Sequence, residues 1–274
     1  MDPDNQLLFA FLLTTLAGLS TGIGGLVAFI KYAQKEKFLA FSLGLSSGAM
    51  IYISFVELIV GSLDDLKTSN EADMAYTKFA LLFLGGLLAS GLISKLIGMA
   101  MEDIGIFQSK PEIQSLGTAE IKKKKKLYRT GVVTAVALAI HNLPEGLITF
   151  LTSMQDLRLG IGIAVAIAIH NIPEGLAVAI PIYRATGNKT KAFTITLLSG
   201  LSEPFGAAIA YFVFFRQVEP EYLVFVTILV SSVMVYVAFF ELIPSAMDMG
   251  FKRLTSWGII TGMSIMGISL VLLG

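Results

Sequence analysis

Two copies of one short string contain both histidines of the chain. Residues 141–147 read HNLPEGL and residues 170–176 read HNIPEGL, and each copy lies inside a long apolar segment. Imidazole, amide and carboxylate groups are costly to bury at membrane depth, and intramembrane ionisable groups are functional by default. The doubled string therefore predicts a binding site built from nitrogen and oxygen ligands.

The spacing inside each copy places the polar groups on one side of a helix. The histidine and the glutamate are four residues apart and share a face, and the asparagine, three residues before the glutamate, flanks that face. A third acidic residue within an apolar segment, Glu203, stands directly before Pro204. Imidazole nitrogens with carboxylate and amide oxygens suit Zn²⁺ or Fe²⁺, and carboxylates shared by two ions would support a binuclear site. The candidate metal ligands are His141, Asn142, Glu145, His170, Asn171, Glu174 and Glu203.

A single histidine in a helix is more often a core residue than a ligand. Here both histidines share one sequence context and accompany three intramembrane carboxylates, which favours a functional site. The roles of Glu57 and Glu241 stay open between lining an entrance or exit, gating, and snorkelling at a helix end. Met50 is open between thioether ligation and packing.

The composition indicates a polytopic membrane protein. The 274 residues are 55% hydrophobic with a mean hydropathy of +0.77, too apolar for an ordinary soluble domain. We predict an all-α polytopic fold in one transmembrane domain, residues 1–274, with apolar runs of about 20 residues as spans. The eight expected spans are approximately 7–30, 38–60, 78–100, 130–152, 159–182, 192–215, 222–246 and 255–273. The acidic start, residues 1–4, is unlike a cleavable signal. The absence of cysteine excludes disulfides, thiolate ligands and cysteine nucleophiles.

Lysine and arginine gather in the loops after the first, third, fifth and seventh spans. Because such residues favour the cytoplasmic side, both termini are expected outside the cytoplasm. The longest connection, 101–129, contains the five-lysine run 122–126 and no histidine. It is expected to be a solvated cytoplasmic loop, with attraction to anionic lipid as the weaker reading.

Two pairs of spans repeat a pattern. Met50-Ile51-Tyr52 followed by Glu57-Leu58-Ile59 matches Met234-Val235-Tyr236 followed by Glu241-Leu242-Ile243, and Gly18-Leu19-Ser20 with Gly24 matches Gly200-Leu201-Ser202 with Gly206. The charge-derived orientation reverses each pair. We therefore predict a 3+2+3 inverted repeat of the eight transmembrane helices, which is typical of secondary transporters.

The doubled His-Asn-x-Pro-Glu-Gly string and the Ser202-Glu203-Pro204-Phe205-Gly206 string resemble the ZIP (Zrt/Irt-like protein) family of divalent-metal transporters. The resemblance extends over nearly the whole chain and is closest to the bacterial broad-range zinc and iron uptake branch.

The resemblance implies a protein of the plasma (inner) membrane that takes up Zn²⁺ and Fe²⁺, with Mn²⁺, Co²⁺ and Cd²⁺ as further candidates, into the cytoplasm. It implies a first metal held by His141, Glu145, His170 and Glu174. It implies a second held by Asn142, Asn171, Glu174 and Glu203, with bridging glutamates. It further implies elevator-like motion of spans one, four, five and six against the other four, and a homodimer in the lipid bilayer. No prosthetic group and no nucleic-acid partner are expected.

Two other classes compete with this interpretation. An intramembrane zinc-dependent hydrolase needs three protein ligands, an open position for water and a general base, which the strings supply only crudely. A proton-coupled transporter of an organic solute would use the carboxylates as a proton relay. The concentration of histidine, asparagine and glutamate in two short strings is instead typical of a metal site. We therefore expect a transporter and not an enzyme.

Overall fold

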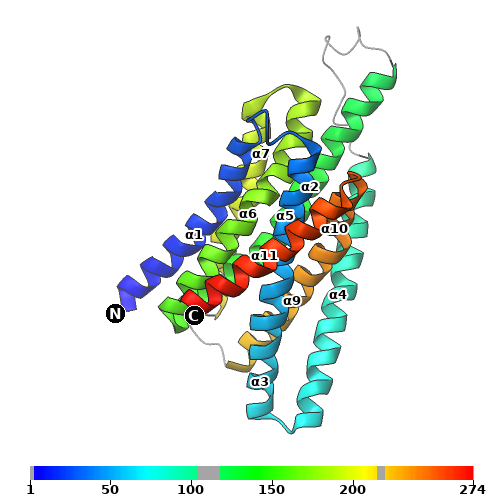
Figure 1. Cartoon of the computed structure of the whole chain (residues 1–274). Coiled ribbons are helices and arrows are strands. Elements are labelled where there is room, and N and C mark those ends of the chain that lie inside the picture. Colours follow the sequence, from blue (N-terminus) through cyan, green and yellow to red (C-terminus); the bar gives the residue numbers. More distant parts are fainter. Residues whose placement is uncertain (1–2, 104–117, 215–219, 274) are drawn as a thin grey trace.

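The computed structural model describes residues 3–103, 118–214 and 220–273, and it is a bundle of long helices (Figure 1). No β-strand occurs in these three ranges, so the predicted all-α fold is confirmed. The α-helices are α1 (Pro3–Val27), α2 (Glu36–Tyr52), α3 (Ile59–Ser69), α4 (Ala72–Asp103), α5 (Thr118–Gln155), α6 (Leu157–Thr186), α7 (Lys189–Gly200), α8 (Ser202–Ile209), α9 (Pro220–Tyr236), α10 (Ile243–Asp248) and α11 (Lys252–Leu273). Three short π-helical segments connect some of them: η1 (Ile53–Leu58), η3 (Ala210–Phe214) and η4 (Val237–Leu242).

Eight helical stretches in the described residues are long and apolar enough to cross a membrane, as the sequence predicts. They are Asn5–Val27, Glu36–Thr68, Ala72–Leu96, Lys124–Gln155, Leu157–Thr186, Lys189–Phe212, Val224–Asp248 and Lys252–Leu272. The second and seventh stretches each continue through a π-helical segment, so that α2, η1 and α3 form one span and α9, η4 and α10 another.

The predicted loop 101–129 needs a correction. Helix α5 already begins at Thr118, so the five-lysine run lies in a helix and not in a loop. Residues 118–130 contain neither glycine nor proline, and lysine has a high helix propensity, which outweighs the repulsion between the lysines. Residues 104–117 of the predicted loop lie outside the described residues.

A tight turn sets the two His-Asn strings side by side. Asp156 alone separates α5 from α6, and its carboxylate accepts hydrogen bonds from the backbone N–H groups of Arg158 (2.8 Å) and Leu159 (3.1 Å). This N-cap starts α6 directly after α5 ends, so the two helices form an antiparallel pair. At the far end of α6, Gly187 has a φ of 67°, a left-handed conformation that glycine adopts without strain.

Glycines allow α1 and α8 to approach this pair closely. A Cβ at Gly24 of α1 would collide with the backbone of Ile172 in α6, and a Cβ at Gly206 of α8 would collide with the backbone of Leu143 in α5. Outside this group, α2 packs on α11 and α9 packs on α4. In the predicted repeat, the contact of α1 with α6 would correspond to that of α8 with α5, and the contact of α2 with α11 to that of α9 with α4.

The π-helical segments repeat in the same way. Segments η1 and η4 occupy positions offset by 184 residues in the numbering, the same offset that relates Met50 to Met234. Each segment contains one glutamate, Glu57 or Glu241. Matching irregularities of this kind are what the predicted inverted repeat would produce.

Candidate metal centre

The seven predicted ligands lie together inside the bundle. Three come from α5, three from α6, and Glu203 comes from the first turn of α8, which packs on α5. The side chains of all seven residues are completely buried, with exposed fractions of 0%. Ionisable groups without any access to solvent require compensation by partners or by a bound ion.

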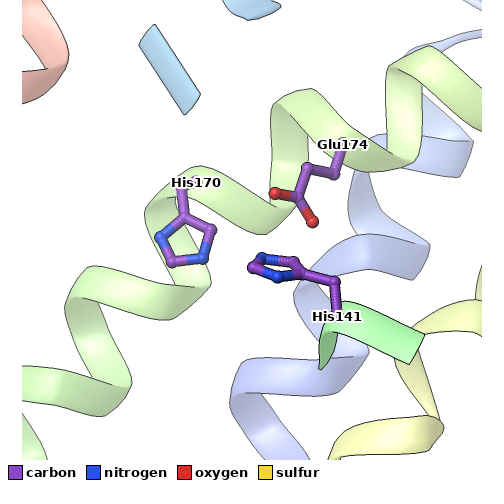
Figure 2. Close-up of side chains that lie close together, drawn as sticks. All are labelled: His141, His170 and Glu174. Atoms are coloured by element: carbon purple, nitrogen blue, oxygen red, sulfur yellow. The ribbon is translucent and has the colours of Figure 1, made fainter. Parts of the chain in front are cut away.

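The histidines and two of the glutamates form the first part of the centre. The Glu145 carboxylate oxygen Oε1 lies 3.0 Å from Nε2 of His170 and 3.1 Å from Nε2 of His141. The His170 contact has hydrogen-bond geometry, and the His141 contact does not. Figure 2 shows His141, His170 and Glu174 pointing toward one another, and their ligand atoms all lie within 4.8 Å of each other.

This spacing is close to that of a zinc site. Tetrahedral zinc with bonds of about 2.0–2.1 Å holds its ligand atoms about 3.4 Å apart, so small side-chain movements would let His141, His170 and Glu174 bind one ion. Glu145 is already in contact with both imidazoles and can contribute a further oxygen.

The asparagines and Glu203 form the second part of the centre. The Asn171 amide donates to the Ala17 carbonyl oxygen of α1 (3.1 Å) and to the carboxylate of Glu203. The Asn142 amide donates to the Ser199 carbonyl oxygen at the end of α7 (3.4 Å). Both amide nitrogens are therefore turned to the backbone, and both amide oxygens are turned away from it.

Several buried polar atoms of the centre have no hydrogen-bond partner among the described residues. They are Nδ1 of both histidines, Nε2 of His141, Oδ1 of Asn142 and Asn171, and Oε2 of Glu145, Glu174 and Glu203. Leaving a buried polar atom unpaired costs about 1–3 kcal/mol, so a cluster of such atoms calls for a ligand. Amide and carboxylate oxygens are lone-pair donors, and a divalent cation is a ligand that would satisfy them together.

The prolines affect the three helices differently. Helices α5 and α6 continue through Pro144 and Pro173, whereas the sixth span breaks at Leu201, between α7 and α8. Pro204 cannot donate to the Gly200 carbonyl, and this carbonyl lies where a Cβ at Gly18 of α1 would be. The break thus places Glu203 at the start of a helix against α1.

One residue of the centre was missed in the sequence. The Ser46 hydroxyl of α2 donates to Oε1 of Glu174 (3.1 Å), and it lies 3.9 Å from the Met50 sulfur. Both Ser46 and Met50 are fully buried. A pair of serines in an apolar span is a weak signal, because serine often bonds to its own helix backbone, as Ser47 does to the Leu43 carbonyl (2.7 Å).

Cavities lie on two sides of the centre. One of about 400 Å³ is lined by Glu57, Ser62, Asp65 and Gln155, together with the buried Ile148 and Ile163. A small cavity of about 50 Å³ is lined by His141 and Glu241, and it shares Glu241 with a cavity of about 220 Å³ that extends to Glu36 and Arg184. Glu57 and Glu241 both line cavities, so neither points only to the lipid.

Comparison with known sequences gives a consistent result. The family described as ZIP zinc transporter matches residues 107–270, more than half of the chain. The zinc transporter ZupT of Streptococcus mutans is 43% identical over 267 residues, which are 97% of this chain and 98% of the relative. The zinc transporters ZupT of Campylobacter jejuni (98% of each chain covered) and Clostridium perfringens (99% of this chain, 98% of the relative) are each 41% identical.

These relatives are transporters, so the hydrolase alternative finds no support. The eight apolar spans and the family together make the protein a multi-pass membrane protein for divalent-metal transport. The chain belongs to the ZIP zinc transporter family, whose members are transporters and not enzymes.

Proposed function

We propose that this protein takes up Zn²⁺, and with it Fe²⁺ and related divalent ions, through a binuclear site at the middle of the bundle. The observation that carries the proposal is the set of seven fully buried ligand residues, each of which has a nitrogen or oxygen without a hydrogen-bond partner among the described residues. The curated relatives are zinc transporters that match this chain over nearly their whole length, which supports zinc as a cargo. The mixed nitrogen and oxygen ligands do not favour zinc alone, which supports a broader range.

In the proposed binuclear arrangement, the first ion binds His141, Glu145, His170 and Glu174. The separation of the ligand atoms in this group supports the assignment. The second ion binds Asn142, Asn171, Glu174 and Glu203, each of which has an oxygen without a hydrogen-bond partner among the described residues. Glu174 belongs to both groups, and Glu145 also bridges the two ions through its second carboxylate oxygen, because Oε2 of each has no partner among the described residues.

We assign the two sets of cavities to the two ends of the path. The cavity with Glu57 and Asp65 is the outer vestibule, and the buried Ile148 and Ile163 close it toward the centre. The chain of cavities from His141 past Glu241 to Arg184 is the inner exit. The arrangement is therefore inward-facing.

The basic residues support this orientation in the plasma membrane, with both termini outside the cytoplasm. Lys37 lies over the Phe251 ring, Lys189 over Phe29 and Lys191 over Tyr128. These contacts join four basic connections at one end of the bundle, and cytoplasmic ends are basic. Because the chain has no cysteine, single-cysteine variants at Asn70 and Asn188 can be labelled with an impermeant maleimide. Labelling of Asn188→Cys but not Asn70→Cys in intact cells would show that the protein has the opposite orientation.

We also propose that the elevator motion and the homodimer implied by the family apply to this chain. Helix α4 supports the dimer, because it packs mainly on α9 and leaves Leu81, Leu88 and Leu92 exposed on an apolar outward face. Crosslinking of a cysteine placed at Leu88 tests whether a second copy covers this face. A crosslink yield that does not exceed that of random collisions in the bilayer would show that lipid, and not a second copy, covers this face.

The decisive test is uptake into liposomes that contain a zinc-sensitive dye. The His141→Ala/His170→Ala variant should lose saturable uptake, and Glu71→Ala, an exposed carboxylate in a turn, should keep it. Competition by Fe²⁺ and Mn²⁺ then ranks the cargo ions. Metal binding without flux in the wild-type protein would refute transport by this chain alone.

A further inference from the structure

The α1 segment and the α7–α8 segment share local structure at an offset of 182 residues. Ala10, Phe11, Thr14, Gly18, Ser20 and Gly24 recur as Ala192, Phe193, Thr196, Gly200, Ser202 and Gly206. The hydrogen bonds recur with them. Thr14 donates to the Ala10 carbonyl and Thr196 to the Ala192 carbonyl, both at 2.9 Å. The serines agree in the same way: Ser20 donates to the Ala17 carbonyl and Ser202 to the Ser199 carbonyl, both at 2.6 Å.

At the position of Glu203, the first segment has Thr21. Thr21 is completely buried, and its hydroxyl oxygen has no hydrogen-bond partner among the described residues. A buried hydroxyl without a partner is uncommon, because it forfeits the hydrogen bonds it made to water.

The other buried threonines of the described chain show what is unusual about Thr21. Each of them donates to the carbonyl four residues earlier: Thr14, Thr149, Thr196 and Thr255. The equivalent carbonyl for Thr21 belongs to Ala17. That oxygen already accepts hydrogen bonds from Ser20 and from Asn171, a residue of the metal centre. The usual partner of the Thr21 hydroxyl is therefore taken by other donors.

The surroundings of Thr21 mirror those of Glu203. The Cβ of Glu203 lies 3.2 Å from the position that a Cβ would take at Gly18, next to the Ala17 carbonyl that binds Asn171. The hydroxyl of Thr21 lies 3.0 Å from the position that a Cβ would take at Gly200. The neighbouring Ser199 carbonyl is the one that binds Asn142. Thr21 thus lies beside the segment that binds Asn142, as Glu203 lies beside the segment that binds Asn171, and Glu203 is in addition hydrogen-bonded to its asparagine.

We propose that Thr21 is a further cargo-binding residue of the metal centre. Its hydroxyl holds a water molecule in the shell of the second divalent ion, on the Asn142 side, while Glu203 supplies a carboxylate on the Asn171 side. A hydroxyl can both donate and accept, so it suits a metal-bound water that also reaches the free Asn142 oxygen. The proposal rests on the proposed transport function and adds to it a residue outside the known strings.

The difference between the two sides has a consequence for the range of ions. One flank of the second ion is charged and the other is neutral and hydrated. Zinc in proteins is usually held by four ligands, whereas Mn²⁺ prefers six oxygen ligands. A residue that holds a metal-bound water therefore helps Mn²⁺ more than Zn²⁺, and Thr21 widens the range of cargo.

The test compares Thr21→Val with Thr14→Val and Thr196→Val in purified protein reconstituted in nanodiscs. Valine keeps the shape of the side chain and replaces the hydroxyl by a methyl group. The two controls lose a hydroxyl that bonds only to backbone, one on the same helix and one at the symmetric place. Binding of Zn²⁺ is followed by titration calorimetry, and Mn²⁺ is used as the competitor.

We expect Thr21→Val to weaken the second binding step about three- to tenfold, the loss of one hydrogen bond, with a larger loss for Mn²⁺ than for Zn²⁺. Thr21→Ser should restore the wild-type affinities, and Thr21→Ala replaces Thr21→Val if the latter fails to fold. Affinities within twofold of wild type, a loss matched by Thr14→Val, or a loss larger for Zn²⁺ would each overturn the proposal. Wild-type protein that neither binds nor transports metal would instead refute the proposed function.

Discussion

The segment α1 and the segment α7–α8 make the same contacts with opposite partners. Gly24 brings α1 against α6, and Gly206 brings α8 against α5. One asparagine from each partner helix donates to the facing segment, Asn171 to α1 and Asn142 to α7. Against this common packing, the two segments differ in charge where Thr21 of α1 corresponds to Glu203 of α8.

The helix geometry differs at the same place. Helix α1 is continuous through Gly22, whereas the sixth span breaks at Leu201, three residues before Pro204. The two segments therefore share their packing, and a short stretch of the second segment adds a charge and an irregular backbone. A carrier that holds two ions in unequal sites needs such a difference, because symmetric ligands alone would bind the two ions alike.

Replacing a glutamate that both ions share should have the largest effect. Glu145→Ala and Glu174→Ala each remove a carboxylate at the contact between α5 and α6, and neither site can then bind normally. We expect uptake to fall more than about 100-fold, since even partners outside the ligand shell typically cost 10- to 100-fold. Dye-loaded liposomes measure this loss, with exposed Glu71→Ala as the matched control. Wild-type flux in either variant would rule out a shared, binuclear site.

The next prediction tests whether the scaffold is symmetric. Gly24→Ala and Gly206→Ala should destabilise the protein by similar amounts, because in each case the added methyl group meets a backbone carbonyl of the partner helix. Overpacking of this kind costs about 1–3 kcal/mol. Thermal unfolding in detergent measures it, and Gly61→Ala, which meets nothing within 4 Å, should not lower the midpoint. Destabilisation by only one of the two variants would show that the two contacts are not equivalent.

The asparagines test whether the chemistry is asymmetric. The Asn171 amide bonds to both a carbonyl and the Glu203 carboxylate, and the Asn142 amide makes one long bond of 3.4 Å. Hydrogen bonds to charged groups contribute about 1.5–3 kcal/mol, and neutral ones about 1 kcal/mol. Asn171→Ala should therefore lower the affinity for the second ion roughly tenfold more than Asn142→Ala does. Metal titration resolves the two ions. Equal losses, or loss of both ions in Asn142→Ala, would contradict the division of ligands.

The sequence predicts most of this centre because its ligands repeat at helical spacing. His141 and Glu145 share a face by spacing alone, and the apolar runs fix the existence of the eight spans. The helix from Thr118 was not predicted, because a run of lysines is compatible with either a solvated loop or a helix. Thr21 and Ser46 were missed for another reason. Their importance depends on which neighbours lie within about 3 Å, and that is set by packing between distant segments.

The smallest predicted effect concerns Ser46, which contacts the centre from α2 and so adds a further difference between the two glutamates Glu174 and Glu145. Its hydroxyl on α2 holds Oε1 of Glu174, while the counterpart Glu145 is held by imidazoles. Ser46→Ala frees the Glu174 carboxylate to turn, so we expect Zn²⁺ binding to weaken about two- to tenfold, the range for one hydrogen bond.

Ser47→Ala is the matched control for that change, because Ser47 is equally buried and bonds only to the Leu43 carbonyl. Calorimetry on both variants separates orientation of a ligand from loss of helix packing. If the two alanines weaken binding equally, Ser46 contributes only to packing. If Ser46→Ala alone weakens it and Ser46→Thr restores it, then α2, which carries no proposed ligand, helps to set the affinity of the centre. Metal affinity would then depend on how α2 docks against α6, a contact that would change in the proposed elevator motion.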